Sequence, residues 1–223
     1  MNGITEPAKA ASAATQTTET VKMNGTSTTT TTATAAAPDA GLFGDDLISP
    51  EVAKALPDGY KIRALRQSDF NAGFLDCLRV LTTVGDITED QFAGRFEWLS
   101  KQDGGYYILV IEDGGRVVGT GALIVERKLY DAIPFSPRFY SLVAQRCPYI
   151  HNLGLVGHIE DIAVAKDQQG KKLGLRLIQA LDFIAEKVGA YKTILDCSEA
   201  NEGFYIKCGF KRAGLEMAHY YKK

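Results

Sequence analysis

The sequence lacks the features that mark several large classes of protein. Its four cysteines, Cys77, Cys147, Cys197 and Cys208, form no CxxC pair, and the three histidines form no cluster with them. This pattern favours reduced thiols in a cytoplasmic protein over a disulfide framework or a metal site. No apolar run approaches the roughly 18 residues that a membrane-spanning helix needs. The net charge of -2 gives no reason to expect nucleic acid as a partner.

Residues 1–40 also contain very few large apolar side chains, and the segments ASAATQTTET and TSTTTTTATAAAP contain none. Such a segment cannot bury enough surface to offset the entropy lost on ordering, so we expect it to be disordered. It contains no Arg but has Glu6, Glu19 and Asp39, which argues against a mitochondrial presequence. Residues 41–56 are expected to form a short arm, and residues 57–223 one domain with a full core.

Periodicity and turn signals predict alternating strands and helices in the rest of the chain. Thr88 and Gln91 have the spacing of a capping box at the start of a helix, and Asp113-Gly114-Gly115 is typical of a hairpin turn. The expected strands are 60–66, 106–112, 116–126, 155–164, 191–197 and 210–220, and the expected helices are 71–81, 88–100, 171–188 and 199–208. This order predicts one α/β domain with a mixed central β-sheet and flanking helices.

The stretch GHIEDIAVAKDQQGKK, residues 157–172, is the most informative part of the sequence. Its strand carries Glu160 and Asp161, which point to opposite faces unless a bulge intervenes. In the following loop, Gly170 allows the backbone to approach a ligand closely. The N–H groups that begin the next helix favour an anion, and a pyrophosphate would suit them. The alternative interpretation is an ordinary helix start with solvated lysines.

A second set of polar residues lies in LDCSEANEGFYIKCGF. Asp196 follows a strand, at the end where open α/β sheets place ligands. Asn201 and Tyr205 are four residues apart and share one face of a helix. The Tyr205 phenol could donate a proton to a leaving group. The alternatives are a tyrosine packed in the core and an aspartate that only caps the next helix.

The order of elements resembles the GNAT acetyltransferase fold. The segments LRVLTTVGDIT, GHIEDIAV, YKTILDCSEAN and GFYIKCGFKRAGLEM resemble the eukaryotic glucosamine-6-phosphate N-acetyltransferase family. This resemblance covers about residues 57–217. It implies acetyl transfer from acetyl-CoA to the 2-amino group of D-glucosamine 6-phosphate, as a step towards UDP-N-acetylglucosamine, by a homodimer. Two alternatives remain: a GNAT enzyme that acts on a peptide or another small amine, and a non-catalytic acyl-CoA-binding protein.

The resemblance also implies residue roles by position. Glu160, Asp196 and Tyr205 would manage the proton transfers. The residues expected to contact acetyl-CoA are Ile162, Ala163, Val164, Gln169, Gly170, Lys171, Lys172, Leu173, Gly174, Leu175, Asn201, Tyr205 and Lys207. The residues expected to bind the sugar phosphate are Thr82, Lys128, His151, Glu160, Asp161, Tyr191, Lys192 and Asp196. Of these, Tyr191 and Lys192 would reach the sugar phosphate across a dimer interface.

The sequence departs from this family at three places. Lys172 replaces the inner glycine of the loop pattern Q/R-x-x-G-x-G/A, which otherwise matches residues 169–174. An atypical insert, residues 129–149, separates Lys128 from His151, which lie close together in the family. The family's C-terminal Arg is absent, so that His219, Lys222 or Lys223 would have to replace it.

Overall fold

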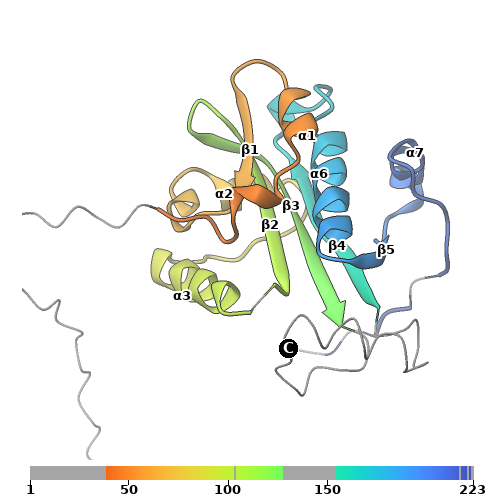
Figure 1. Ribbon diagram of the computed structural model, residues 1–223. Coiled ribbons are helices and arrows are strands. Elements are labelled where there is room, and N and C mark those ends of the chain that lie inside the picture. The colour runs from red at the N-terminus through yellow and green to blue at the C-terminus, as the bar shows by residue number, and fades with distance from the viewer. Residues whose placement is uncertain (1–38, 103, 128–153, 216, 220, 222–223) are drawn as a thin grey trace, which may run out of the picture. The chain divides into compact units, whose positions relative to one another are not determined.

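The computed structural model of the protein describes residues 39–102, 104–127, 154–215, 217–219 and 221 (Figure 1). The predicted disordered tail, apart from Asp39 and Ala40, lies outside these residues, as does the 129–149 insert. In chain order the elements are η1 (Asp45–Leu47), α1 (Pro50–Lys54), β1 (Tyr60–Ala64), η2 (Gln67–Phe70), α2 (Phe74–Leu78), α3 (Glu89–Ser100), β2 (Tyr106–Asp113), β3 (Arg116–Arg127), β4 (Leu155–Val164), η3 (Lys166–Gln168), α6 (Leu173–Lys187), β5 (Ala190–Ile194) and α7 (Glu199–Lys207).

The strands in the described part of the chain form one mixed sheet in the order β1-β2-β3-β4-β5. Neighbours from β1 to β4 are antiparallel, and β5 runs parallel to β4. A parallel pair needs a crossover connection, and α6 supplies it. The β2–β3 turn places Gly114 and Gly115 at φ values of 56° and 85°, which glycine adopts without a steric penalty. The predicted mixed sheet with flanking helices and the predicted hairpin are therefore confirmed.

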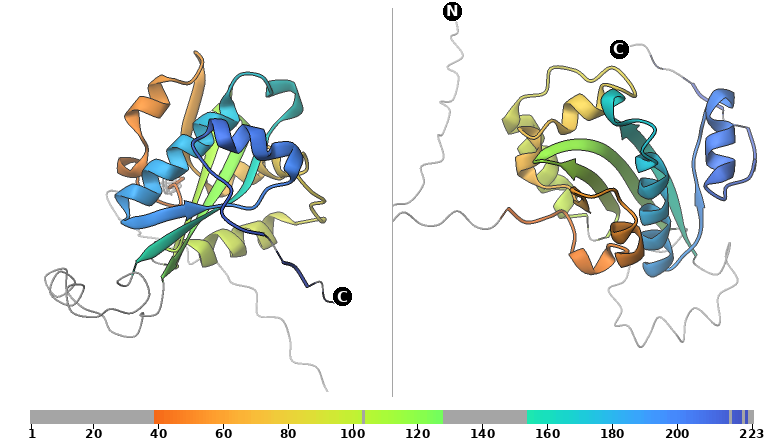
Figure 2. Two further views of the ribbon diagram at one scale, coloured as in Figure 1. Left: turned by 90° about the vertical axis from the view of Figure 1, so that its right-hand side faces the viewer. Right: turned by 90° about the horizontal axis from the view of Figure 1, so that it is seen from above.

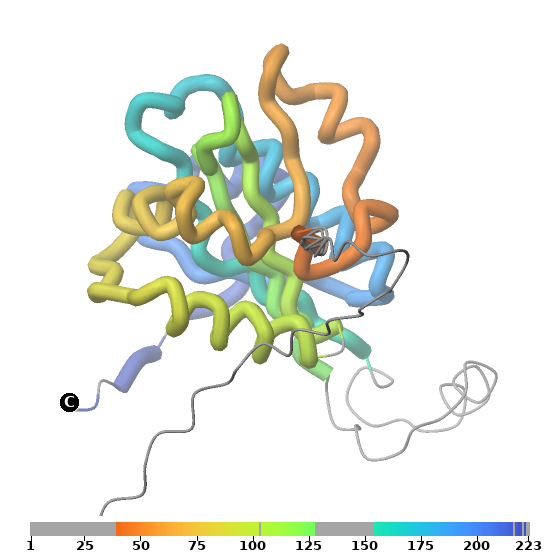
Figure 3. The backbone as a smooth tube through the Cα atoms, turned by 90° about the vertical axis from the view of Figure 1, so that its left-hand side faces the viewer, coloured from red at the N-terminus to blue at the C-terminus, as the bar shows by residue number. Residues whose placement is uncertain are grey.

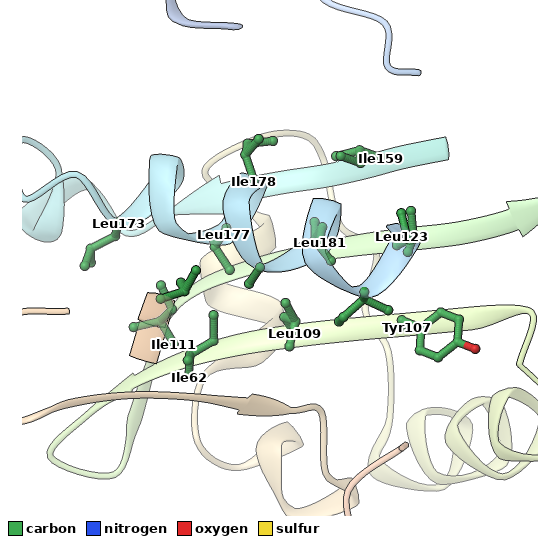
Figure 4. Packing of buried hydrophobic residues seen from close by; sticks show 14 of the residues in the cluster. Ile62, Tyr107, Leu109, Ile111, Leu123, Ile159, Leu173, Leu177, Ile178 and Leu181 are labelled. Carbon is green, nitrogen blue, oxygen red and sulfur yellow. The ribbon is translucent and has the colours of Figure 1, made fainter. Parts of the chain in front are cut away.

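Helix α6 covers one face of the sheet, and its apolar stripe forms the larger part of the core (Figure 4). Leu177 and Leu181 of α6 are fully buried against side chains that include Leu109 and Leu123 of the sheet. The stripe follows from the sequence, where Leu173, Leu177, Leu181, Ile184 and Val188 are spaced three or four residues apart. Burial of each such leucine contributes about 1.5–3 kcal/mol.

The other face of the sheet packs against α2 and α3. Successive side chains of a strand point to opposite faces of the sheet. In β2, Leu109 accordingly packs on the α6 side, and Val110 belongs to the cluster that contains Phe74 and Phe92. Figure 3 shows α3 lying across this face, and Figure 2 shows α6 on the opposite one. The predicted capping box of α3 is confirmed, since Thr88 and Gln91 exchange side-chain to backbone hydrogen bonds.

A buried ion pair fixes η2, and with it the approach to α2, against β1. Two guanidinium nitrogens of Arg63 bond the carboxylate of Asp69 at 2.7 and 2.8 Å, and its Nε donates to Glu112 at 2.8 Å. Asp69 is fully buried. The hydrogen bond to Asp69 raises the pKa of Arg63 most, and the hydrogen bond to Glu112 raises it further. Removing one partner of such a pair typically costs about 3–5 kcal/mol.

Three predicted elements differ from the structure. The helix expected at 71–81 is confined to α2, because Gly73 has a left-handed φ of 89° and interrupts it. The strand expected at 191–197 ends at Ile194. The strand expected at 210–220 is absent from the described residues of that span, where Leu215 and Met217 are 89% and 91% exposed. In the described residues this segment has no neighbouring strand with which to form hydrogen bonds. An unpaired strand is not stable in water.

None of the helices in the described ranges combines the length and the apolar character that crossing a bilayer requires.

Candidate active site

A β-bulge in β4 determines where the adjacent acids lie. The register of β3 against β4 shifts between Thr120 and Ala122. At this point Asp161 adopts a left-handed φ of 54°, a conformation that aspartate tolerates better than most residues. Both Glu160 and Asp161 are exposed. The bulge was named from the sequence as the condition for both acids to enter one pocket. It is present, but of the two acids only Asp161 lines the cavity described below, and Glu160 lies near Tyr205.

Strand β5 accompanies only the first part of β4. The parallel pairing ends where His158 of β4 meets Ile194 of β5. Strand β4 continues to Val164, so residues 162–164 have β3 on one side and lie beyond the end of β5 on the other (Figure 2). Backbone N–H and C=O groups at such an opening can pair with an extended amide chain.

The connection from β4 to α6 contains two left-handed residues, Gly170 and Lys172, with φ values of 83° and 62°. Lys172 is the N-cap of α6, but its side chain makes no capping hydrogen bond. The N–H groups of the first turn are therefore not satisfied by the cap. A Cβ atom built at Gly170 would meet nothing within 4 Å, so the space beside this residue is open. This geometry suits a phosphate at the helix N-terminus.

Two side chains of the same loop point away from such a ligand. Leu173 is 1% exposed and anchors the start of α6 in the core, so only its backbone can reach a cofactor. The ammonium group of Lys171 donates to the Tyr60 hydroxyl and to Gln168 Oε1, both at 2.6 Å. Lys171 is among the residues expected to contact acetyl-CoA, whereas in the structure its ammonium is directed toward Tyr60 of β1.

Helix α7 carries Tyr205, and its neighbour Phe204 lies beside Gly174 in the first turn of α6. Tyr205 packs against the α6 core cluster, and its ring lies 5.0 Å from that of Phe204, measured between centroids. Burial raises the pKa of the Tyr205 phenol, with smaller contributions from the neighbouring Cys197, Cys208 and Glu160. The phenol is therefore protonated at neutral pH and lies within electrostatic range of the Glu160 carboxylate. Both properties suit a general acid beside a base.

Three further residues of the predicted site lie near α7. Asp196, Asn201 and Lys207 are all exposed. Asp196 lies between β5 and α7, where the N-cap of α7 is Ser198, so the alternative that Asp196 is the N-cap of this helix is wrong. Asn201 is in the first turn of α7 and Lys207 is its last residue.

On the other face of the sheet, α2, α3 and the loop between them line an open cavity of about 850 Å³ that reaches the β4 bulge. Asp161 lines it, together with Asp86 and the side chains of Gln91 and Arg95 from α3. Most of the remaining lining is apolar. Thr82 is exposed and is not among the lining residues. The bulge thus places Asp161 on this side, whereas Glu160 lies near Tyr205.

Arg95 and Asp86 are not among the site residues predicted from the sequence. A signal for Arg95 was present, because it follows the capping-box residue Gln91 by four positions and so lies on the same helix face. Its guanidinium lies 5.2 Å from the centroid of the Trp98 ring. Arg95 thus adds a positive charge to a cavity lining that also contains the acid Asp161.

The remaining predicted site residues are distributed differently. Lys128, His151, Lys222 and Lys223 lie outside the described residues. Tyr191 and Lys192 lie on β5, at an edge of the sheet, and both are exposed. In the described ranges, no group of His, Cys, Asp and Glu side chains has the arrangement of a metal site.

Comparisons with known proteins identify this arrangement. The family model of the GNAT acetyltransferases matches residues 68–210. The chain belongs to the GNAT acetyltransferase family. Glucosamine 6-phosphate N-acetyltransferase of Candida albicans is 44% identical over 163 residues, covering 73% of this chain and 96% of that protein. The enzyme of the same name from Dictyostelium discoideum is 38% identical over 171 residues, covering 76% and 96%.

A solved structure leads to the same family. The crystal structure of glucosamine-6-phosphate N-acetyltransferase from Arabidopsis thaliana superposes with a TM-score of 0.63 at 33% identity, covering 73% of this chain and 99% of that one. The resemblance stated from the sequence motifs is therefore confirmed. In this GNAT domain the family match includes the bulged strand β4, the loop before α6, and α7.

Proposed function

We propose that the protein transfers the acetyl group of acetyl-CoA to the 2-amino group of D-glucosamine 6-phosphate. One observation carries the proposal: β4 bulges and separates from β5 directly beside a helix N-terminus. This arrangement provides a slot for an extended amide chain next to a site for phosphate. The similarity to the curated enzymes supports the choice of acceptor. The reaction would supply a precursor of UDP-N-acetylglucosamine in the cytoplasm, where free thiols such as Cys77 and Cys197 persist.

In this proposal the donor lies along β4. The backbone of residues 162–164 pairs with the pantetheine amides, and the backbone from Gly170 to Leu175 binds the pyrophosphate. Asn201 and Lys207 of α7 contact CoA from the other side of the opening. Holding both reactants in one site makes the attack effectively unimolecular, and N–H groups of β4 polarise the thioester carbonyl.

The protons are managed by three residues around the opening. The amine of the acceptor must lose a proton, and Glu160 or the backbone carbonyl of Asp196 accepts it. Tyr205 protonates the departing thiolate, a role that its raised pKa supports, because a protonated phenol is available throughout the neutral range. General acid–base steps of this kind contribute about 10²- to 10⁴-fold to the rate.

The acceptor enters from the side of the α2–α3 cavity in this proposal. Asp161 and Thr82 contact the sugar, and Lys128, His151, Tyr191 and Lys192 contribute to phosphate binding, as the resemblance implies. The presence of Arg95 and Asp161 among the cavity's lining residues supports this direction of approach, since the acceptor carries both a phosphate and an amine.

A thiol-release assay with acetyl-CoA and a panel of amines tests the proposed function. We expect CoA to be released rapidly with D-glucosamine 6-phosphate and only slowly with glucosamine, which lacks the phosphate. Rapid release with peptides instead would select the alternative of a peptide acetyltransferase. Binding of CoA without transfer to any amine would select a non-catalytic acyl-CoA-binding protein.

We further propose that the enzyme is a homodimer in which β5 lies at the interface. In the described part of the chain β5 is a sheet edge, and Tyr191 on it is 44% exposed. The segment after α7 exposes Leu215 and Met217 almost completely, and partner chains commonly cover such apolar surface. An unprotected edge strand pairs readily with another chain.

Sedimentation velocity is expected to give the mass of a dimer for the natural protein. The double variant Leu215→Asp, Met217→Asp should shift the equilibrium toward monomer, because it buries charge in the proposed interface. Exchange of two exposed residues on α3, Glu97→Gln and Ser100→Ala, serves as the control and should leave the mass unchanged. A natural protein that remains monomeric at micromolar concentration would contradict the dimer.

A further inference from the structure

A polar contact between the start of β1 and the loop before α6 joins residues that are far apart in the sequence. The Tyr60 hydroxyl donates to Gln168 Oε1 at 2.6 Å. The Lys171 ammonium donates to both of these oxygen atoms, also at 2.6 Å, and lies 5.2 Å from the centroid of the Tyr60 ring. Gln168 is only 9% exposed. We call Tyr60, Gln168 and Lys171 the Tyr60 latch.

A second contact holds the same loop from the side of β3. The Arg116 guanidinium bonds the Asp167 carboxylate and lowers the pKa of that acid. This pair is exposed on both sides, so it contributes little energy by itself. In the Tyr60 latch Gln168 is nearly buried, whereas Lys171 is exposed. The two hydrogen bonds that the Lys171 ammonium donates have a charged donor, which makes them stronger than neutral hydrogen bonds.

The latch is adjacent to the strained part of the loop. Lys172 holds a left-handed φ of 62° at a position where the family pattern has glycine. A residue with a side chain persists in this conformation only where its surroundings determine it. The side chain of Lys171 is anchored immediately before this residue, and the backbone of Leu173 is fixed immediately after it by burial in the core. The strained peptide is therefore held from both ends.

We propose that the Tyr60 latch holds the loop in its cofactor-binding conformation and compensates for the missing glycine at position 172. Tyr60 and Gln168 are positioning residues that act through the backbone of the loop. The inference rests on the proposed function, in which this backbone binds the CoA pyrophosphate. It assigns the Lys171 ammonium to the latch and leaves phosphate binding to the backbone N–H groups.

Tyr60→Phe and Gln168→Met test the latch, because each removes a polar atom while keeping most of the side-chain volume. We expect KM for acetyl-CoA to rise about tenfold, equivalent to about 1.4 kcal/mol of binding free energy, with kcat and the KM for the sugar phosphate within about twofold of the natural enzyme. Tyr106→Phe is the matched control. Tyr106 is the first residue of β2, and Tyr60 pairs with Asp113, the last residue of that strand, so the control lies away from the latch. Tyr106→Phe should leave kcat and both KM values unchanged.

Two readouts separate positioning from a general loss of structure. With S-acetylpantetheine, a donor that has no pyrophosphate, Tyr60→Phe and the natural enzyme should give the same kcat/KM. Adding Lys172→Gly to Tyr60→Phe should restore most of the lost affinity for acetyl-CoA, since glycine adopts the required φ without strain. KM does not depend on the folded fraction, so a less stable variant still gives a valid result.

The outcomes distinguish this inference from the proposed function. An unchanged KM for acetyl-CoA in both single variants would overturn the latch while the natural enzyme remains an acetyltransferase. An equal loss with S-acetylpantetheine, or no recovery with Lys172→Gly, would also overturn it. Failure of the natural protein to bind acetyl-CoA would instead refute the proposed function, which the assay of the natural enzyme reveals before any variant is measured.

Discussion

Replacement of Tyr205 by Phe is expected to lower kcat by about 10²-fold or more. The phenol lies within electrostatic range of the Glu160 carboxylate on β4, and burial keeps its pKa above the ordinary value, so it is protonated at neutral pH and can donate to the departing thiolate. Phenylalanine keeps the edge-to-face ring contacts with Phe204 and Phe210. The substitution therefore removes the proton donor with little change in packing. Steady-state kinetics with saturating acetyl-CoA and sugar phosphate measure the effect.

The dissociation constant of CoA provides the internal control for this variant. We expect calorimetry to show a change of no more than about twofold, since a hydroxyl that acts in the transition state adds little to ground-state binding. A large loss of CoA affinity with unchanged kcat would assign Tyr205 to cofactor binding. Unchanged values of both constants would remove it from the mechanism.

The parts of the site that lie on regular elements were predictable from the sequence. The apolar periodicity of α6 determined which face it buries, and this placed the start of the helix beside β4. The position of Tyr205 followed from its spacing to Asn201 and from the family motif. These predictions depend on local sequence patterns, and in a natural protein such local preferences usually agree with the overall fold.

The parts that depend on contacts between distant residues were not predictable. Nothing near Lys171 in the sequence indicates that its ammonium bonds Tyr60, because the two residues meet only after β1 and the loop have packed. The bulge at Asp161 was named only as a condition, since it arises from pairing with β3. The strand expected at 210–220 failed for a related reason: its alternation requires a neighbouring strand, and the described chain provides none.

The second strong prediction is that the β4 bulge requires a residue without a side chain at position 121 of β3. Gly121 lies between Thr120 and Ala122, the residues where the pairing with β4 shifts. A Cβ atom added at Gly121 would lie 2.5 Å from Ile162 Cδ1 and 3.1 Å from Leu181 Cδ1. Ile162 must then rotate away, and Leu181 of α6 leaves little room for this because it is fully buried.

Gly121→Ala is therefore expected to destabilise the fold by about 1–3 kcal/mol, the usual cost of overpacking a core. It should also lower kcat/KM for acetyl-CoA by about 10²-fold, because Ile162 belongs to the strand segment that presents the thioester, and small displacements there are costly. Chemical denaturation measures the first effect and steady-state kinetics the second. The loss of stability and the loss of activity have the same cause, which is one added methyl group in contact with Ile162 of β4.

Gly119→Ala is the matched control, two residues earlier on the same face of β3. A Cβ atom there would meet Leu177 at 3.4 Å, Ile111 at 3.5 Å and the Ala163 carbonyl at 3.7 Å, which are ordinary contacts. This variant should be as stable as the natural protein, or more stable by up to about 1 kcal/mol, because alanine loses less backbone entropy on folding. If Gly121→Ala and Gly119→Ala behave alike, the bulge does not depend on a glycine at position 121.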